Sequence, residues 1–227
     1  MRKFVFILII SIFICQRCKK KTEPIITYTF RIPQQLYDYA YFKVGTYWVY
    51  QDSVTSIIDS VYVTYAKEGV YENVDQTANH YKGTFGYFRS IATSSYDHYK
   101  YENWVDQNWN VNGVLALEKY SYTVVNREKF ITSGSGSNYG TAIFTSDVEV
   151  GKKFYSYLDY IEFQQLYSNF TVKTHTFGAT QKWYNGKSIL DDKQNTYYYI
   201  SKNIGIVRRE QLDSNHIWNL IRYNIVQ

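Results

Sequence analysis

Cysteine and proline are almost absent from this chain of 227 residues. Its two cysteines, Cys15 and Cys18, and its two prolines, Pro24 and Pro33, all fall at the start of the chain. The remainder therefore holds no disulfide, no cysteine metal ligand and no cysteine nucleophile. A single domain of about 200 residues buries roughly 70% of the surface of its unfolded chain, so the lack of disulfides is no handicap to its stability.

The main hydrophobic run is too short to cross a membrane. Residues 4–14 form this run, and as a helix it would span about 17 Å against the roughly 30 Å of a bilayer's hydrocarbon core. Arg2 and Lys3 precede it, and Cys18 follows it. A basic start followed by a short apolar run is the pattern of a secretory signal. The sequence therefore predicts an exported protein.

The junction after this run resembles the lipoprotein signals of Bacteroidetes. In those signals the apolar run ends at a cysteine that is acylated and becomes the mature N-terminus, often followed by lysines, and three lysines follow Cys18 here. The resemblance implies a signal peptide over residues 1–18, lipidation of Cys18 with Cys15 as the alternative, and a membrane anchor. It places the protein in the bacterial cell envelope, at the outer rather than the inner membrane. A conventional signal peptide cut near this point and an uncleaved N-terminal anchor remain alternatives.

The folded part of the chain lacks an excess of basic residues. The whole chain has a formal charge of +5, but six of its 25 lysines and arginines precede Thr22, which leaves 19 basic against 20 acidic residues. Nucleic-acid binding needs basic residues clustered on one face of the folded domain. We therefore expect no nucleic-acid partner, and we expect the three lysines after Cys18 to lie beside lipid headgroups.

Aromatic residues are abundant, with 26 tyrosines, 13 phenylalanines and 5 tryptophans. They favour sheet, because a ring packs against its cross-strand neighbours while a phenol oxygen reaches water. Runs of strand type, separated by turn signals roughly every 8 to 15 residues, cover residues 47–52, 58–65, 81–91, 96–105, 114–122, 124–131, 139–145, 161–177, 196–201, 205–212 and 217–226.

These runs predict an all-β fold with at most one or two short helices. We expect residues 41–227 to form a single curved antiparallel meander, closed or half-open as a barrel, because an open sheet of this size would leave an apolar face and two edges bare. The early part of residues 151–167 is expected to be a loop or a short helix. Residues 19–40 contain both remaining prolines and no sustained period, which is typical of a tether.

Two segments carry a second resemblance: residues 42–50, FKVGTYWVY, and residues 197–210, YYYISKNIGIVRRE. Together they resemble a broad, largely uncharacterised group of exported bacterial lipoproteins with KVGxxWxY-like and YYxxxxIGIVxxE-like motifs. The resemblance implies a curved sheet similar to that of lipoprotein carriers, and it carries no catalytic residues. From the residues themselves, we expect Gly45 and Gly205 to permit a tight turn or bulge at strand starts, and Trp48 to plug one end of the barrel.

The sequence offers little for catalysis. Its four histidines, His80, His98, His175 and His216, are scattered singly, without the spacing of a metal site. Asp191 and Asp192 are adjacent, but they point to opposite sides if extended and indicate a solvated loop. We therefore expect no catalytic residues, no metal and no cofactor, and we expect the protein not to be an enzyme.

One segment has the composition of a sugar-binding surface. It contains Tyr99, Tyr101, Trp104 and Trp109, interleaved with acids and amides. The alternative is an ordinary two-faced strand with its hairpin. We therefore expect a non-enzymatic domain that holds an apolar or amphipathic ligand such as a lipid in its curved sheet. A glycan-binding or protein-interaction module is the second interpretation, and an enzyme the third.

Overall fold

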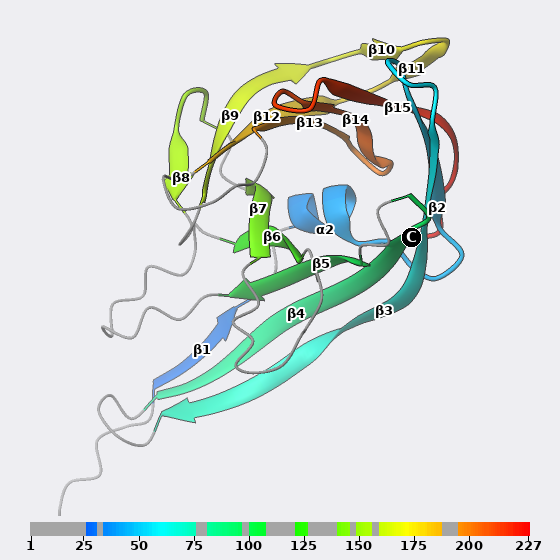
Figure 1. The fold of residues 1–227 in the computed structure, drawn as a ribbon. Helices are drawn as coiled ribbons and strands as arrows, with labels where there is room; N and C mark the ends of the chain where they lie inside the picture. The colour runs from blue at the N-terminus through cyan, green and yellow to red at the C-terminus, as the bar shows by residue number, and fades with distance from the viewer. Residues whose placement is uncertain are drawn as a thin grey trace, which may run out of the picture.

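The computed structural model describes residues 26–30, 34–75, 81–96, 100–107, 121–126, 140–145, 149–155, 159–187 and 195–227. These residues form fifteen strands and one helix, which confirms the all-β prediction (Figure 1). In chain order the elements are β1 (Ile26–Phe30), α2 (Gln34–Ala40), β2 (Tyr47–Asp52), β3 (Ile58–Asp75), β4 (Tyr81–Ser94), β5 (Lys100–Gln107), β6 (Ser121–Asn126), β7 (Gly140–Thr145), β8 (Lys153–Tyr155), β9 (Asp159–Tyr167), β10 (Phe170–Val172), β11 (His175–Phe177), β12 (Thr180–Lys187), β13 (Thr196–Ser201), β14 (Gly205–Gln211) and β15 (His216–Asn224).

Thirteen of these strands form one curved sheet, in the order β7-β6-β5-β4-β3-β2-β15-β14-β13-β12-β9-β8, with β1 added in parallel to β4. The other neighbours are antiparallel and mostly consecutive in the chain, as in a meander. The first strand of this meander, β2, pairs with the last, β15. The two halves of the chain are therefore joined through their terminal strands.

The curl of the sheet ends at β7 and β8. In the described part of the chain these two strands form the edges, and Cα atoms of β7 approach those of β9 and β12 to within 8 Å without strand pairing. The sheet is thus a half-open barrel. It is closed where β2 pairs with β15, and it is open between β7 and β8, the two edge strands of the described sheet. This agrees with the predicted curved meander.

Alternation along the strands separates a buried face from an exposed one. On β3, Asp59, Val61 and Val63 are buried, whereas Ile58 and Tyr62 are exposed. Successive residues of a strand point to opposite sides of the sheet, so this pattern requires one face to lie against the core. The buried carboxylate of Asp59 interrupts this apolar pattern on β3, and it needs a partner inside the barrel.

The structure differs from the expected tether over residues 19–40. Residues 26–30 pair with β4 as β1, and residues 34–40 form α2, whose Leu36, Tyr39 and Ala40 are buried. The spacing of these three residues places them on one helical face. Pro33 directly precedes the helix in sequence, a position where proline often signals a helix start rather than a linker.

The observed strands differ from the predicted ones in several places. The run expected over 161–177 is divided into β9, β10 and β11, with Lys173 at a φ of 51° between the last two. A residue in this left-handed conformation cannot continue a strand. Part of the segment expected to be a loop or helix forms β8, which pairs with β9. The strand β12 had no predicted counterpart.

The two segments that resemble the lipoprotein group lie against each other. Gly205 has a φ of 89°, and a Cβ atom there would lie 3.2 Å from the Phe42 ring and 3.5 Å from Trp48. Trp48 is 5% exposed, meets Phe42 edge to face and donates its Nε1 hydrogen to the carbonyl oxygen of Ile204 at 2.6 Å. The predicted burial of Trp48 and the predicted turn at Gly205 are both confirmed.

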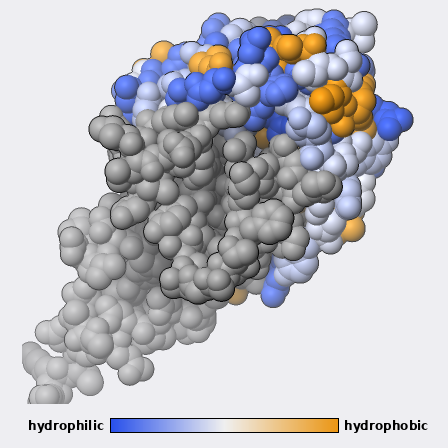
Figure 2. Space-filling model, in the orientation of Figure 1, coloured by the Kyte–Doolittle hydropathy of each residue, from blue (hydrophilic) through white to orange (hydrophobic). Residues whose placement is uncertain are grey.

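The surface that the structure describes is mostly hydrophilic in the view of Figure 2, with apolar groups in separate patches. The exposed large apolar residues include Val44, Tyr47, Val54, Ile58, Tyr62, Tyr65, Val70 and Leu166. Scattered apolar residues are normal on a protein surface, so only their arrangement carries information.

Candidate functional site

The concave face of the half-open barrel is apolar, and α2 lies against it (Figure 1). Four residues at and just after the helix pack into this face: Leu36, Tyr39, Ala40 and Tyr41. Their partners from the sheet are Phe88, Ile161, Phe163, Trp183 and Ile200. These partners come from β4, β9, β12 and β13, so the helix spans both halves of the barrel.

Aromatic rings fill the contact between the helix and β4. The ring centroids of Tyr37 and Tyr41 each lie 5.1 Å from that of Phe88, and the two tyrosine rings meet edge to face at 5.7 Å. Burial raises the pKa of Tyr37, Tyr39 and Tyr41, so all three phenols stay neutral at physiological pH. The face therefore presents flat apolar walls with neutral hydroxyl groups.

Polar contacts of one residue fasten the helix at the end of the barrel. The carboxylate of Asp38 lies 3.1 Å from the ammonium group of Lys202, and its backbone carbonyl accepts a hydrogen bond of 2.7 Å from the N–H of Asn203. Both partners lie in the turn between β13 and β14. Lys202 is half exposed, so the ion pair contributes little stability.

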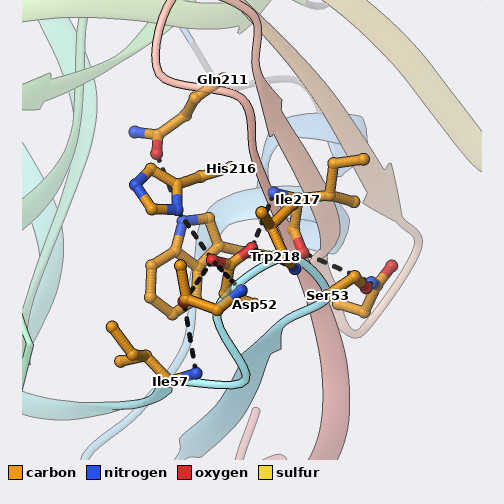
Figure 3. Close-up of polar contacts among 10 residues, drawn as sticks. Asp52, Ser53, Ile57, Gln211, His216, Ile217 and Trp218 are labelled. Carbon is orange, nitrogen blue, oxygen red and sulfur yellow. Dashed lines mark hydrogen bonds and ion pairs between the residues drawn. The ribbon is translucent and has the colours of Figure 1, made fainter.

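A second candidate site lies where two turns meet, at the ends of β2 and β15. Asp52 is fully buried there. Its carboxylate accepts hydrogen bonds from the N–H groups of Val54 (3.2 Å), Thr55 (3.1 Å) and Ile217 (2.9 Å), from the Thr55 hydroxyl (2.5 Å) and from Nδ1 of His216 (2.8 Å). Figure 3 shows Asp52 between His216 and Ile217.

Burial alone would raise the pKa of Asp52, but the hydrogen bonds from Thr55, His216, Ile217 and Val54 outweigh it and hold the pKa well below its usual range. The carboxylate is therefore ionised at neutral pH, which makes Nδ1 of His216 the donor. These contacts join the β2–β3 turn to the β14–β15 turn across 164 positions of sequence.

A buried ion pair lies inside the barrel beside this cluster. The side chains of Asp59 and Arg209 are 0% and 6% exposed, and their charged atoms are 3.0 Å apart. The carboxylate of Asp59 also accepts hydrogen bonds from the hydroxyl of Ser94 at 2.6 Å and the N–H of Tyr96 at 3.3 Å. The pair supplies the partner that the buried Asp59 requires, and it connects β3 to β14 across β2 and β15.

Trp218 packs between the two polar clusters. The guanidinium carbon of Arg209 lies 4.8 Å from its ring, and the rings of Tyr96 and His216 lie 5.0 and 6.0 Å away. Its Nε1 donates a hydrogen bond to Gln211 at 3.2 Å, and Figure 3 shows Trp218 with Gln211 and His216. Aromatic packing thus covers part of both polar clusters, and the carboxylates of Asp52 and Asp59 are fully buried.

Within the part of the chain that the structure describes, the Asp52–His216 pair is not completed to a hydrolytic triad. Such a triad needs a nucleophile at the imidazole nitrogen opposite the one that the carboxylate holds. Within the described residues, the Thr55 hydroxyl bonds to Asp52, and no described hydrogen bond places a hydroxyl group at Nε2 of His216. The arrangement fits a clamp that fixes two turns. In the sequence His216 looks isolated, because no local pattern around it indicates that its turn lies next to the turn that contains Asp52.

The sequence-predicted site residues are only partly covered by the structure. Cys15, Cys18, Tyr99 and Trp109 lie outside the described residues, as do His80, His98, Asp191 and Asp192. Tyr101 and Trp104 belong to β5, where the register pairs Tyr101 with Ala92 and Trp104 with Arg89.

The structure brings together a different aromatic pair, on the outer face. Tyr47 on β2 lies directly opposite Tyr62 on β3, and their side chains are 36% and 47% exposed. Arg222 places its guanidinium 6.0 Å from the Tyr47 ring. The alternation in residues 47–52 and 58–65 was visible in the sequence, but the register that aligns the two rings was not.

Comparison with known proteins returns no relative: no family model, no curated protein and no solved structure matches the chain. Within the residues described, none of the helices has the length and apolar character needed to cross a bilayer. The same residues contain no group of three histidine, cysteine, aspartate or glutamate side chains placed to hold a metal ion.

Proposed function

We propose that the protein is a membrane-anchored, non-enzymatic binding module of the bacterial cell envelope that holds an apolar or amphipathic small molecule, such as a lipid, on its concave face. The observation that carries this proposal is the contact of α2 with that face. A helix of seven residues, fastened by Asp38, covers an aromatic and aliphatic surface that spans both halves of the barrel.

In this proposal the ligand displaces α2 from the concave face. The free energy gained by burying an acyl chain there is large enough to offset the loss of the helix contacts. Isolated helices shorter than about 12 residues are marginal in water, so α2 depends on its contact with the sheet. Burial of Leu36 and Tyr39 contributes about 3–6 kcal/mol. Burial of about eight methylene groups at about 0.8 kcal/mol each offsets that loss, and a lipid acyl chain has more than eight. The neutral phenols around the face suit a polar headgroup.

The N-terminal segment supports the membrane location. Acylation of Cys18 would attach the domain to the layer that contains such ligands, and the three lysines after Cys18 favour anionic headgroups. The half-open barrel is a scaffold of the kind that binds ligands at its mouth or concave face.

The experiment uses the full chain in vesicles and a fluorescent fatty acid. We expect saturable binding that tightens by up to about fivefold in Asp38→Ala, because this change removes the ion pair with Lys202, which contributes at most about 1 kcal/mol, and does not touch the apolar face. The backbone hydrogen bond from Asn203 to residue 38 remains in this variant. Ile58→Glu is the matched control: Ile58 is exposed on the outer side, so binding should not change. Absence of saturable binding in both the parent and Asp38→Ala, with thermal melts unchanged, would refute the proposal.

The exposed pair Tyr47 and Tyr62 favours glycan binding as a second candidate function. Aromatic rings stack on the apolar face of a sugar, and these two rings lie on neighbouring strands beside the cation of Arg222. Oligosaccharide titrations test it. Saturable binding that is lost in Tyr62→Ala, while fatty-acid probes fail to bind, would replace the lipid proposal by this one.

A further inference from the structure

The strands β3 and β4 extend well beyond the rest of the sheet. On one side β2 pairs with β3 only as far as Tyr62, and on the other β5 pairs with β4 only from Phe88 onward. From Gly69 and Tyr87 to their far ends, β3 and β4 pair, within the residues that the structure describes, with each other and with β1 only. This three-stranded projection, hereafter the arm, extends away from the barrel in Figure 1.

The N-terminal segment enters the fold at the free end of the arm. Because β1 runs parallel to β4 and Ile26 pairs with Tyr81, the first residue of β4, the chain begins its pairing beside the far end of β3. Figure 1 shows the start of β1 next to the ends of β3 and β4. Cys18 precedes Ile26 by eight residues, and eight residues reach at most about 29 Å even when fully extended.

We propose that the arm is the membrane-facing part of the protein and that its free end lies at the headgroup layer of the lipid bilayer. This inference rests on the acylation of Cys18 in the proposed function. A lipid at Cys18 keeps the free end of the arm within about 29 Å of the membrane surface, the greatest length of the chain between Cys18 and Ile26. The described side chains of β3 next to the arm and at its start are exposed and mixed in character, among them Tyr65, Lys67, Glu68 and Val70. Such a mixture suits headgroups rather than hydrocarbon.

The orientation of the rest of the molecule follows from this placement. From Ile58 to Val70 the chain follows about 40 Å of strand, so the β2–β3 turn lies at the membrane-distal end. Asp52 and His216 lie at that turn, which directs their cluster away from the bilayer. The arm thus acts as a spacer that holds the barrel above the surface.

Energy transfer to labelled lipids tests the orientation. The parent is the full chain, acylated in a bacterial host and floated with phosphatidylcholine vesicles that contain an acceptor-labelled lipid. Acylation at Cys18 leaves no free thiol after signal removal, because the chain has no cysteine beyond that position. Val70→Cys and Val54→Cys then each carry a single donor dye. They are matched, since both residues are exposed valines, 71% and 53%, with Val70 on the arm and Val54 in the turn between β2 and β3.

We expect several times more energy transfer from position 70 than from position 54. Insertion of twenty Gly and Ser residues after Lys21 should reduce the transfer from position 70, because a longer connection no longer confines the arm. Equal transfer from the two positions, or more from 54, would overturn the orientation while flotation shows the anchor intact. A chain that does not float, or that floats equally well as Cys18→Ser, would refute the anchor of the proposed function and the orientation with it.

Discussion

The buried ion pair of Asp59 and Arg209 gives the sharpest test of the observed register. Asp59→Asn keeps an acceptor for Ser94 and Tyr96 but leaves the guanidinium of Arg209 without its counter-charge inside the barrel. Removal of one partner from a buried pair costs about 3–5 kcal/mol. Arg209→Met removes in addition the stacking of the cation on Trp218 at 4.8 Å, which contributes about 0.5–2 kcal/mol. We therefore expect Arg209→Met to be the more damaging change.

A double-mutant cycle measures the coupling. Urea unfolding followed by tryptophan fluorescence gives the free energy of unfolding of the parent, the two single variants and the double variant. Because the double variant leaves no unpaired charge, its loss should fall short of the sum of the single losses by about 2 kcal/mol. A neighbouring pair, Arg208 and Glu210, supplies the control: its side chains are 29% and 19% exposed, so Arg208→Met should cost no more than about 1 kcal/mol.

Additive single losses, or losses below about 1 kcal/mol for both variants, would contradict the reasoning. Either result would mean that Asp59 and Arg209 do not meet inside the barrel. The observed strand order places Asp59 on β3 and Arg209 on β14, with β2 and β15 between them.

Three further predictions concern the core, the turn clamp and the anchor. Trp48→Ala should lower the free energy of unfolding by about 3–5 kcal/mol in denaturant melts, and a loss below about 1 kcal/mol would place Trp48 at the surface. The lowered pKa of Asp52 contributes stability that is complete above the unfolded value near 3.9 and is lost as the pH falls below it; thermal melts between pH 2 and 6 should show this slope flattened in Asp52→Asn. Cys18→Ser should abolish fatty-acid labelling and membrane sedimentation, whereas label that persists there and vanishes in Cys15→Ser would move the lipid to Cys15.

The strands were predictable where side chains alternate clearly. The run at 196–201 coincides with β13, and the run at 47–52 with β2. The sequence did not predict α2, because a helix of seven residues is too short to show a clear helical period in its apolar residues. The division of the run at 161–177 depends on the positive φ of Lys173. No signal in the sequence indicated it, because lysine is not a residue that favours this conformation.

The sites were less predictable than the strands. The sequence drew attention to Tyr101 and Trp104, whereas the structure aligns Tyr47 with Tyr62 on the outer face. It also joins Asp52 to His216, which the sequence treated as unrelated. Each of these contacts depends on which strands are neighbours and in which register, and a shift of one residue would have moved every side chain to the other face.

By itself the sequence determined the class of fold, because alternation and aromatic content are local properties that each segment carries without reference to the others. It also located both cysteines ahead of the domain and placed Gly45, Trp48 and Gly205 in motifs that proved to serve the core. Only the tertiary structure decided that β2 pairs with β15, that α2 covers the concave face, and that β1 joins the free end of the arm. The physical reason is that distant segments pair in the way that buries the most apolar surface between them. This buried area depends on both segments together and cannot be read from either one alone.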